Sequence, residues 1–188
     1  MRAWRFGLVA GTVLTLGLIS YLLAPASTRL RPVPGPMTGQ VERVMDGDSF
    51  VLNGVGIRLA DIDAPEYDQL CQDAGGADWP CGRVAGQRLR TLLTTGVACT
   101  SSGWDSYDRV LARCSAQDTD IAGTMVAEGL AISSGAYATE QAEARAARRG
   151  LWAGTFVPPR QFRQSNGTAD SPTRLERFVT TLGEWIGS

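Results

Sequence analysis

Short β-like runs separated by tight turns fill the middle of the chain and constrain its fold more than any other feature. Three runs come first, then a helical pattern of apolar residues, then two more runs; in order these are Gln40–Met45, Asp48–Leu52, Ile57–Ile62, Gly82–Thr94, Val97–Ser102 and Val110–Ser115. Asp-Gly and Asn-Gly pairs between the first three runs are typical of β-hairpins. Five short strands with a helix between the third and fourth are typical of the five-stranded OB barrel. We therefore predict a mixed α+β fold built on this barrel.

Two more helices are predicted after the strands. Asp120 is placed to cap a helix over Ile121–Glu128, which Gly129 ends, and an Ala-rich helix over Glu140–Arg149 stops at Gly150. With the helix between the strands, this gives three helices that flank the barrel.

The ends of the chain divide into further segments. Residues 27–38 form a Pro-rich spacer, and the polar stretch 164–172 has the composition of a linker. In residues 173–188 apolar side chains recur at intervals of three to four, which indicates an amphipathic tail helix. We expect this tail to dock on its own domain, residues 39–163, with a partner or a membrane surface as alternatives.

The N-terminal residues have the pattern of an export signal. Arg2 and Arg5 precede an uncharged apolar run, Phe6–Leu23, slightly shorter than the roughly 20 residues that span a bilayer as a helix. Ala24-Pro25-Ala26 then has the small-x-small form of a cleavage site. We predict that residues 1–26 are a signal peptide or a single-pass signal anchor. Because the basic residues precede the run, the N-terminus should stay inside and the domain should be extracytoplasmic, either periplasmic or secreted.

The cysteines fit an exported protein, because disulfides persist outside the cytoplasm. Cys99 and Cys114 lie in the two predicted strands at equal distances from the turn between them. Opposite residues of an antiparallel pair lie about 4.5–5.5 Å apart at Cα, which a disulfide can bridge. We predict a Cys99–Cys114 disulfide, which leaves Cys71 to pair with Cys81. Four unpaired buried thiols are the alternative.

Composition excludes several kinds of chemistry. Histidine and lysine are both absent, so Ser-His and Cys-His nucleophile pairs are excluded, and arginine is the one cationic side chain. The cysteines are too far apart for a C-x-x-C zinc site. The net charge is −1, so a polyanion could be held only through a local arginine site.

Five carboxylates and an arginine gather in one short segment of the chain. They are Asp46, Asp48, Arg58, Asp61, Asp63 and Glu66. Carboxylates so close would repel one another unless a cation or arginines compensated their charge. Carboxylate and backbone oxygens suit a hard ion such as calcium, although no EF-hand loop is present.

Three segments resemble signature segments of the staphylococcal nuclease (thermonuclease) family. These are Asp46–Ser49, Arg58–Glu66 and Asp105–Arg109, and the resemblance covers about residues 39–163. The resemblance implies an OB barrel capped by helices. It also implies a calcium-dependent hydrolase that cleaves phosphodiester bonds of single-stranded DNA or RNA and leaves 3′-phosphates.

The resemblance also implies a set of binding residues. Asp48 and Asp63 correspond to the calcium carboxylates, and Ala64 to a calcium ligand through its backbone carbonyl. Tyr107 and Tyr137 fall where aromatic residues of the family contact the nucleotide. The implied partner is a nucleic acid or short nucleotide, together with the membrane if the N-terminal helix is not cleaved, and we expect a monomer.

Three residues carry the implied catalysis. Arg58 and Arg109 match the arginines that grip the phosphate, and their planar guanidinium groups can stabilise the negative charge that builds on phosphorus. Glu66 matches the carboxylate assigned as general base for the attacking water. Ser106 and Asp108 depart from the family turn and suggest weaker binding of long polyanions. The alternative is a catalytically weak, membrane-tethered nuclease-like module that binds nucleic acid or protein.

Overall fold

We analysed a computed structural model that describes residues 32–94 and 96–170. The chain divides into two compact units, and the described residues belong almost entirely to the second, which starts at Val33. The predicted signal helix, residues 1–26, and the predicted tail helix, residues 173–188, lie outside the described residues. Among the helices of the described ranges, none is long and apolar enough to cross a membrane.

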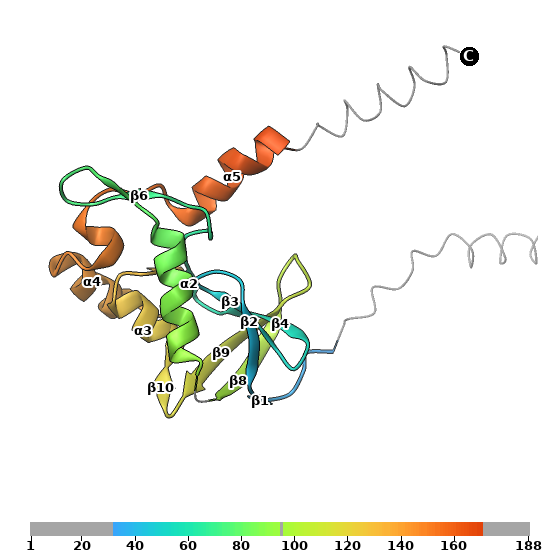
Figure 1. Ribbon diagram of the computed structural model, residues 1–188. Helices are drawn as coiled ribbons and strands as arrows, with labels where there is room; N and C mark the ends of the chain where they lie inside the picture. Colours follow the sequence, from blue (N-terminus) through green and yellow to red (C-terminus); the bar gives the residue numbers. More distant parts are fainter. Residues whose placement is uncertain (1–31, 95, 171–188) are drawn as a thin grey trace, which may run out of the picture. The chain divides into compact units, whose positions relative to one another are not determined.

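A curled sheet forms the body of the domain (Figure 1). Its strands run in the order β1-β8-β9-β4-β3-β2, with β10 paired to β9. Their bounds are Met37–Gly39 (β1), Val41–Val44 (β2), Ser49–Leu52 (β3), Val55–Leu59 (β4), Val97–Trp104 (β8), Val110–Ala116 (β9) and Thr119–Asp120 (β10). β4 and β9 are parallel, and the other neighbours are antiparallel.

The sheet curls because its first strand is bent. β1 and β2 stand at opposite ends of the strand order, yet only Gln40 separates them in the chain. The two ends of the sheet must therefore approach each other at this residue. An OB-like mixed α+β fold, as predicted, follows from this arrangement.

Two small antiparallel pairs accompany the main sheet. β5 (Ile62–Asp63) pairs with β11 (Ile132–Ser133), and β6 (Cys71–Gln72) pairs with β7 (Asp78–Trp79). The first pair holds Asp63 opposite Ile132, directly after the sheet strand β4. This pairing fixes the backbone of one of the predicted site residues.

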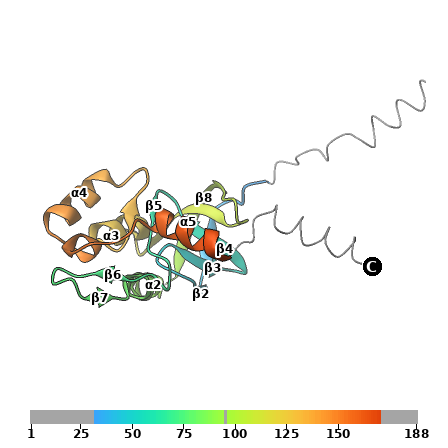
Figure 2. The same cartoon turned by 90° about the horizontal axis from the view of Figure 1, so that it is seen from above.

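Helices pack around the sheet (Figures 1 and 2). They are α2 (Cys81–Leu92), α3 (Ile121–Ala127), α4 (Ala138–Ala146), the 3₁₀ turn η1 (Gly150–Ala153) and α5 (Pro159–Asp170). The carboxylate of Asp120 caps α3 as predicted, accepting a hydrogen bond of 3.0 Å from the backbone N–H of Gly123. The three predicted helices correspond to α2, α3 and α4.

The fourth helix extends into the segment that was predicted as a linker. The polar stretch 164–172 reads as a linker, but α5 continues as a helix to Asp170. Pro159 starts this helix, where its missing N–H and its fixed φ are both tolerated. Asn166 and Gly167, which favour turns in isolation, are thus taken into a helix that begins earlier in the chain.

The core of the domain determines which side chains face outward. Ile57 and Leu59 of β4 are fully buried against Phe50 of β3 and Leu89 of α2. Because side chains alternate across a strand, Arg58 between them points to the opposite face of the sheet. Burial of Ile57 and Leu59 therefore determines the direction in which the Arg58 side chain points.

Both predicted disulfides are present. Cys99 of β8 is directly opposite Cys114 of β9 and is bonded to it. Cys71 is bonded to Cys81 and closes the loop that carries β6 and β7 onto the start of α2. The β8–β9 hairpin contains a register shift between Ser101 and Gly103, which symmetric pairing about the turn did not predict.

Candidate active site

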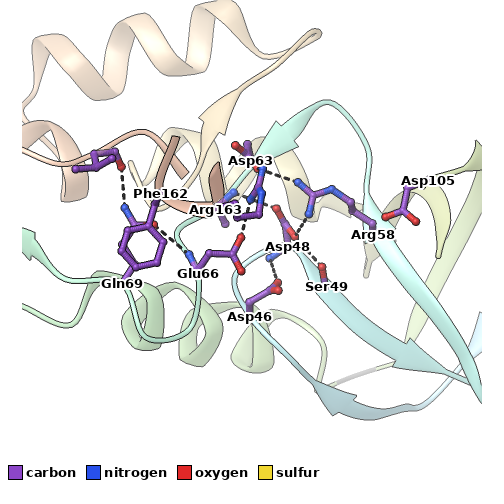
Figure 3. A network of polar contacts seen from close by, with 12 residues as sticks. Asp46, Asp48, Ser49, Arg58, Asp63, Glu66, Gln69, Asp105, Phe162 and Arg163 are labelled. Atoms are coloured by element: carbon purple, nitrogen blue, oxygen red, sulfur yellow. Dashed lines mark hydrogen bonds and ion pairs between the residues drawn. The ribbon is translucent and has the colours of Figure 1, made fainter. Parts of the chain in front are cut away.

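One cleft, with a cavity of about 490 Å³, collects polar side chains from distant parts of the chain. It lies among the β2–β3 turn, β4, the loop after β5, the β8–β9 hairpin and α5. Its lining residues are Met45, Asp46, Arg58, Glu66, Asp105, Ser106, Tyr107, Arg109 and Arg163. Figure 3 shows Arg58, Glu66 and Arg163 around the carboxylates of Asp48 and Asp63.

Arg58 holds two carboxylates side by side. Its Nη1 donates to Oδ1 of Asp48 at 2.9 Å, and its Nη2 donates to Oδ1 of Asp63 at 2.8 Å (Figure 3). Asp48 is 1% exposed and Asp63 7% exposed, so both carboxylates are buried. The second oxygen of Asp48 accepts the backbone N–H of Ala64 at 3.0 Å. The predicted metal-binding residues are thus adjacent in space.

The carboxylate of Asp48 is buried beside a second acid, Asp46. Burial raises the pKa of Asp48 to about 7, against the lowering effect of Arg58, and the charge of Asp46 raises it further. Asp46 itself shapes the turn, because its carboxylate accepts the backbone N–H of Asp48 at 3.0 Å.

Arg109 enters the cleft from the β8–β9 hairpin. Its Nε donates to Asp105 at 2.7 Å, and its Nη1 donates to the hydroxyl of Ser49 at 2.8 Å. The other oxygen of Asp105 accepts the backbone N–H groups of Tyr107 and Arg109, and the guanidinium lies 5.5 Å from the ring centre of Tyr107. Although burial opposes its charged form, these hydrogen bonds hold the pKa of Asp105 below its usual value. Asp105 therefore organises the hairpin tip around Arg109.

Glu66 lies at the other side of the cleft and meets an arginine that sequence reasoning did not predict. Nη1 of Arg163 donates to Oε1 of Glu66 at 2.6 Å, and Nη2 donates to Oδ1 of Asp63 at 2.8 Å. Arg163 is at the end of the segment with family resemblance and next to a predicted linker. Its local sequence contains no signal that could have directed it to Glu66.

The backbone of Glu66 is also held in place. The buried Gln69 accepts the N–H of Glu66 at 3.2 Å and donates to the carbonyl of Val157 at 2.7 Å (Figure 3). On the other side α2 comes so close that a Cβ on Gly82 would be 1.7 Å from the Glu66 carbonyl oxygen. The loop is clamped between α2 and the segment that leads into α5.

Comparison with known proteins places the chain in a family. The family model described as staphylococcal nuclease homologue matches residues 56–154, which is more than half of the chain. This protein belongs to the staphylococcal nuclease family.

Two curated proteins are similar to this staphylococcal nuclease homologue. Micrococcal nuclease of Shigella flexneri is 32% identical over 143 residues, which cover 64% of this chain and 76% of that protein. Succinoglycan biosynthesis protein ExoI of Rhizobium meliloti (strain 1021) is 32% identical over 125 residues, which cover 62% of this chain and 65% of that protein. This chain therefore spans slightly less than two thirds of the second relative.

The two tyrosines predicted to contact nucleotide differ in their placement in this nuclease homologue. Tyr107 lines the cleft and is 75% exposed. Tyr137 does not line the cleft: it is 7% exposed, and its hydroxyl donates to the carboxylate of Asp120 at 2.9 Å. Burial, with Asp120 next in effect, raises the pKa of Tyr137 above its usual value. Tyr137 thus packs beside α3, because its ring is apolar enough to be buried once its hydroxyl has a partner.

The oxygen ligands suit a hard cation that is largely hydrated. In residues 32–94 and 96–170, no three His, Cys, Asp or Glu side chains form a metal-binding group. Asp48 and Asp63 nevertheless place two carboxylates together, and Ala64 follows directly in the chain. Calcium takes six to eight oxygen ligands, so two carboxylates and a carbonyl would leave the remainder to water and substrate. The residues fit calcium on these terms, whereas Asp61 pairs with Arg113 at 2.6 Å instead.

Proposed function

We propose that this staphylococcal nuclease homologue is a calcium-dependent nuclease that hydrolyses single-stranded DNA or RNA. The observation that carries the proposal is the meeting of Arg58, Glu66 and Arg109 in one cleft. These residues come from β4, the loop after β5 and the β8–β9 hairpin, so it is the fold that brings them together. A phosphodiester placed between them would face two guanidinium groups and a carboxylate.

The arginines would act by charge stabilisation. A guanidinium has five N–H donors and a pKa above about 12, so it stays charged and is a poor proton donor. Arg58 has two of its nitrogens on Asp48 and Asp63, and Arg109 has two on Asp105 and Ser49. These contacts orient each group before substrate binds, which favours the stabilisation of charge that develops on the phosphate.

Glu66 would act on the attacking water. Its carboxylate lines the cleft and is 29% exposed, so water can reach it. A carboxylate at such a position can orient a water molecule and accept its proton as the oxygen attacks phosphorus. Cleavage of the bond to the 5′ oxygen would then leave a 3′-phosphate, as the family resemblance implies.

Asp48, Asp63 and the carbonyl of Ala64 would hold calcium. When bound there, the ion would supply positive charge to the phosphate and lower the pKa of a coordinated water. In this structure Arg58 contacts both carboxylates and keeps them adjacent.

Tyr107 would contact the base or sugar next to the scissile phosphate. An exposed aromatic ring beside an arginine is suited to stacking on a single-stranded base. The net charge of −1 gives little general attraction for a long polyanion, so short or locally bound strands suit the site best.

Hydrolysis of a fluorescent single-stranded DNA oligonucleotide tests this function. We expect cleavage with calcium, none with a calcium chelator, and about a hundredfold or greater loss in Glu66→Gln. Glu143→Gln, the same substitution on the exposed face of α4, is the control and should cleave normally. Binding of the oligonucleotide without cleavage would instead support the nucleic-acid-binding module, and equal cleavage with chelator would reject the calcium dependence.

We also propose an extracytoplasmic location for the domain. Two disulfides in the described domain support it, because such bonds rarely persist in a reducing cytoplasm. A C-terminal alkaline phosphatase fusion, which is active only outside the cytoplasm, tests it directly. Activity of the fusion would support export by residues 1–26, and an inactive but intact fusion would reject it.

A further inference from the structure

Helix α5 contributes to the cleft although it follows the part of the chain that the family model matches. The match ends at residue 154, and α5 begins at Pro159. Arg163, on the second turn of this helix, nevertheless lines the cleft together with Arg58 and Arg109.

A continuous series of ion pairs joins the catalytic groups through this arginine. Oδ1 of Asp63 accepts hydrogen bonds from both Arg58 and Arg163, at 2.8 Å each. Arg163 then donates to Glu66 at 2.6 Å. The order Arg58–Asp63–Arg163–Glu66 thus links the arginine proposed to hold phosphate to the carboxylate proposed to act on water (Figure 3).

The contact leaves half of the Glu66 carboxylate available. Arg163 uses Oε1 of Glu66, and Oε2 makes no hydrogen bond to any described residue. A glutamate side chain has three rotatable bonds, so an unrestrained carboxylate at 29% exposure would sample many orientations. A guanidinium fixed at its other end by the buried Asp63 removes that freedom.

The start of α5 is fixed to the same loop. Gln69 accepts a hydrogen bond from the backbone N–H of Glu66 and donates one to the carbonyl of Val157, so it joins the two segments. These hydrogen bonds therefore tie the helix that carries Arg163 to the loop that carries Glu66. Such a link is what precise placement of a side chain requires.

We propose that Arg163 is a positioning residue of the nuclease site, which orients Glu66 toward the cleft by tying it to Asp63. The proposal rests on the function proposed above. It makes α5 part of the active site, so the functional domain extends beyond the family match to at least Arg163. Because Arg163 acts through Glu66, its loss should lower kcat far more than it raises KM.

The test compares Arg163→Ala, Arg163→Lys and Arg160→Ala in the full chain, with kcat and KM measured on single-stranded DNA with calcium. Arg160 is an exposed arginine one turn earlier on α5, and no described residue forms an ion pair with it, so it controls for loss of charge. We expect Arg163→Ala to lower kcat by about 10- to 100-fold, as misplacement of a reacting group does. Arg163→Lys should recover part of the loss, and Arg160→Ala should stay within about twofold of wild type.

A second measurement separates positioning from a structural role. Added guanidinium ion at millimolar concentration should restore part of kcat in Arg163→Ala but should not affect wild type, and the thermal midpoint should fall by only a few degrees. No rescue with a large fall in the midpoint would overturn the proposal in favour of a structural role. A raised KM with unchanged kcat would overturn it in favour of a substrate contact. An inactive wild type would overturn both this proposal and the proposed function, whereas an active wild type with an unaffected Arg163→Ala would overturn only this one.

Discussion

Nη1 of Arg163 lies 2.6 Å from Oε1 of Glu66, although 97 positions separate the two residues in the chain. The pair brings the last described helix to the loop after β5 and closes one side of the cleft. The opposite side is formed by Arg109 on the β8–β9 hairpin. The cleft therefore depends on contacts between elements that are distant in sequence, and its properties can be tested element by element.

Arg58→Ala should destabilise the protein as well as inactivate it. The substitution leaves the buried carboxylates of Asp48 and Asp63 without their shared partner, and breaking such a pair costs about 3–5 kcal/mol. Arg113→Ala is the control, because its ion pair with Asp61 is exposed and screened by water, so its loss should leave the stability nearly unchanged. Urea unfolding without calcium measures both variants.

Calcium should offset part of the Arg58→Ala loss. If Asp48 and Asp63 hold the ion, added calcium stabilises the variant more than it stabilises wild type, because no arginine then competes for the carboxylates. The same unfolding experiment in millimolar calcium gives the comparison. Identical midpoints with and without calcium in both proteins would argue against a metal site at these residues.

The two tyrosines should respond to substitution in opposite ways. Tyr107→Ala removes an exposed ring from the cleft and should weaken single-strand binding by about 1–3 kcal/mol without changing the unfolding midpoint. Tyr137→Phe removes the hydroxyl that donates to Asp120, which should cost about 1–2 kcal/mol of stability and leave DNA affinity unchanged. Fluorescence anisotropy measures the DNA affinity of both variants, and urea unfolding measures their stability. The reversed pattern would contradict the prediction.

Gly82→Ala should disturb the site through the backbone of Glu66. An added Cβ would lie 1.7 Å from the Glu66 carbonyl oxygen, so the loop must shift, at a cost of about 1–3 kcal/mol. Nuclease activity should fall by about tenfold or more, because the carboxylate moves with its backbone. Gly86→Ala, on the same helix, meets only ordinary contacts near 3.4 Å and should keep full activity. Equal activity of the two variants would show that the loop tolerates the shift.

Loss of a disulfide should lower the free energy of unfolding of the domain. The Cys99–Cys114 bond closes a loop of 15 residues, for which the chain-entropy model gives about 3 kcal/mol, and the Cys71–Cys81 bond closes a shorter one. We expect Cys99→Ala/Cys114→Ala to lose slightly more than Cys71→Ala/Cys81→Ala in urea unfolding. An unfolding curve of wild type that dithiothreitol leaves unchanged would contradict the prediction.

Local patterns were sufficient for five strands of the main sheet, three helices and both disulfides, but not for the short strands; β1 (Met37–Gly39) begins inside the predicted Pro-rich spacer 27–38. In β4 the buried residues Ile57 and Leu59 alternate with the outward-facing Arg58, and the sequence shows this alternation as two apolar residues on either side of an arginine. The Cys99–Cys114 pairing follows from the symmetry of a hairpin about its turn, even though a register shift near the turn was not predicted. These features depend on neighbours in the chain, and sequence periodicity reports such neighbours.

Long-range packing decided the rest. The segment 164–172 has turn-forming residues, yet α5 runs through it to Asp170 from its start at Pro159. Tyr137 matched a nucleotide contact by position, but its ring is buried and its hydroxyl bonds Asp120. Neither outcome is encoded in the nearest residues, because each depends on a surface that another part of the chain provides.

The sequence by itself determined which chemistry this protein can perform. It has no histidine and no lysine, so carboxylates and arginines must carry the chemistry, and their order around Asp48, Arg58 and Glu66 indicates the family. Only the tertiary structure decided that Arg163 joins them. An ion pair across 97 positions leaves no periodic trace in the chain, since it requires the fold to bring α5 back to the loop after β5.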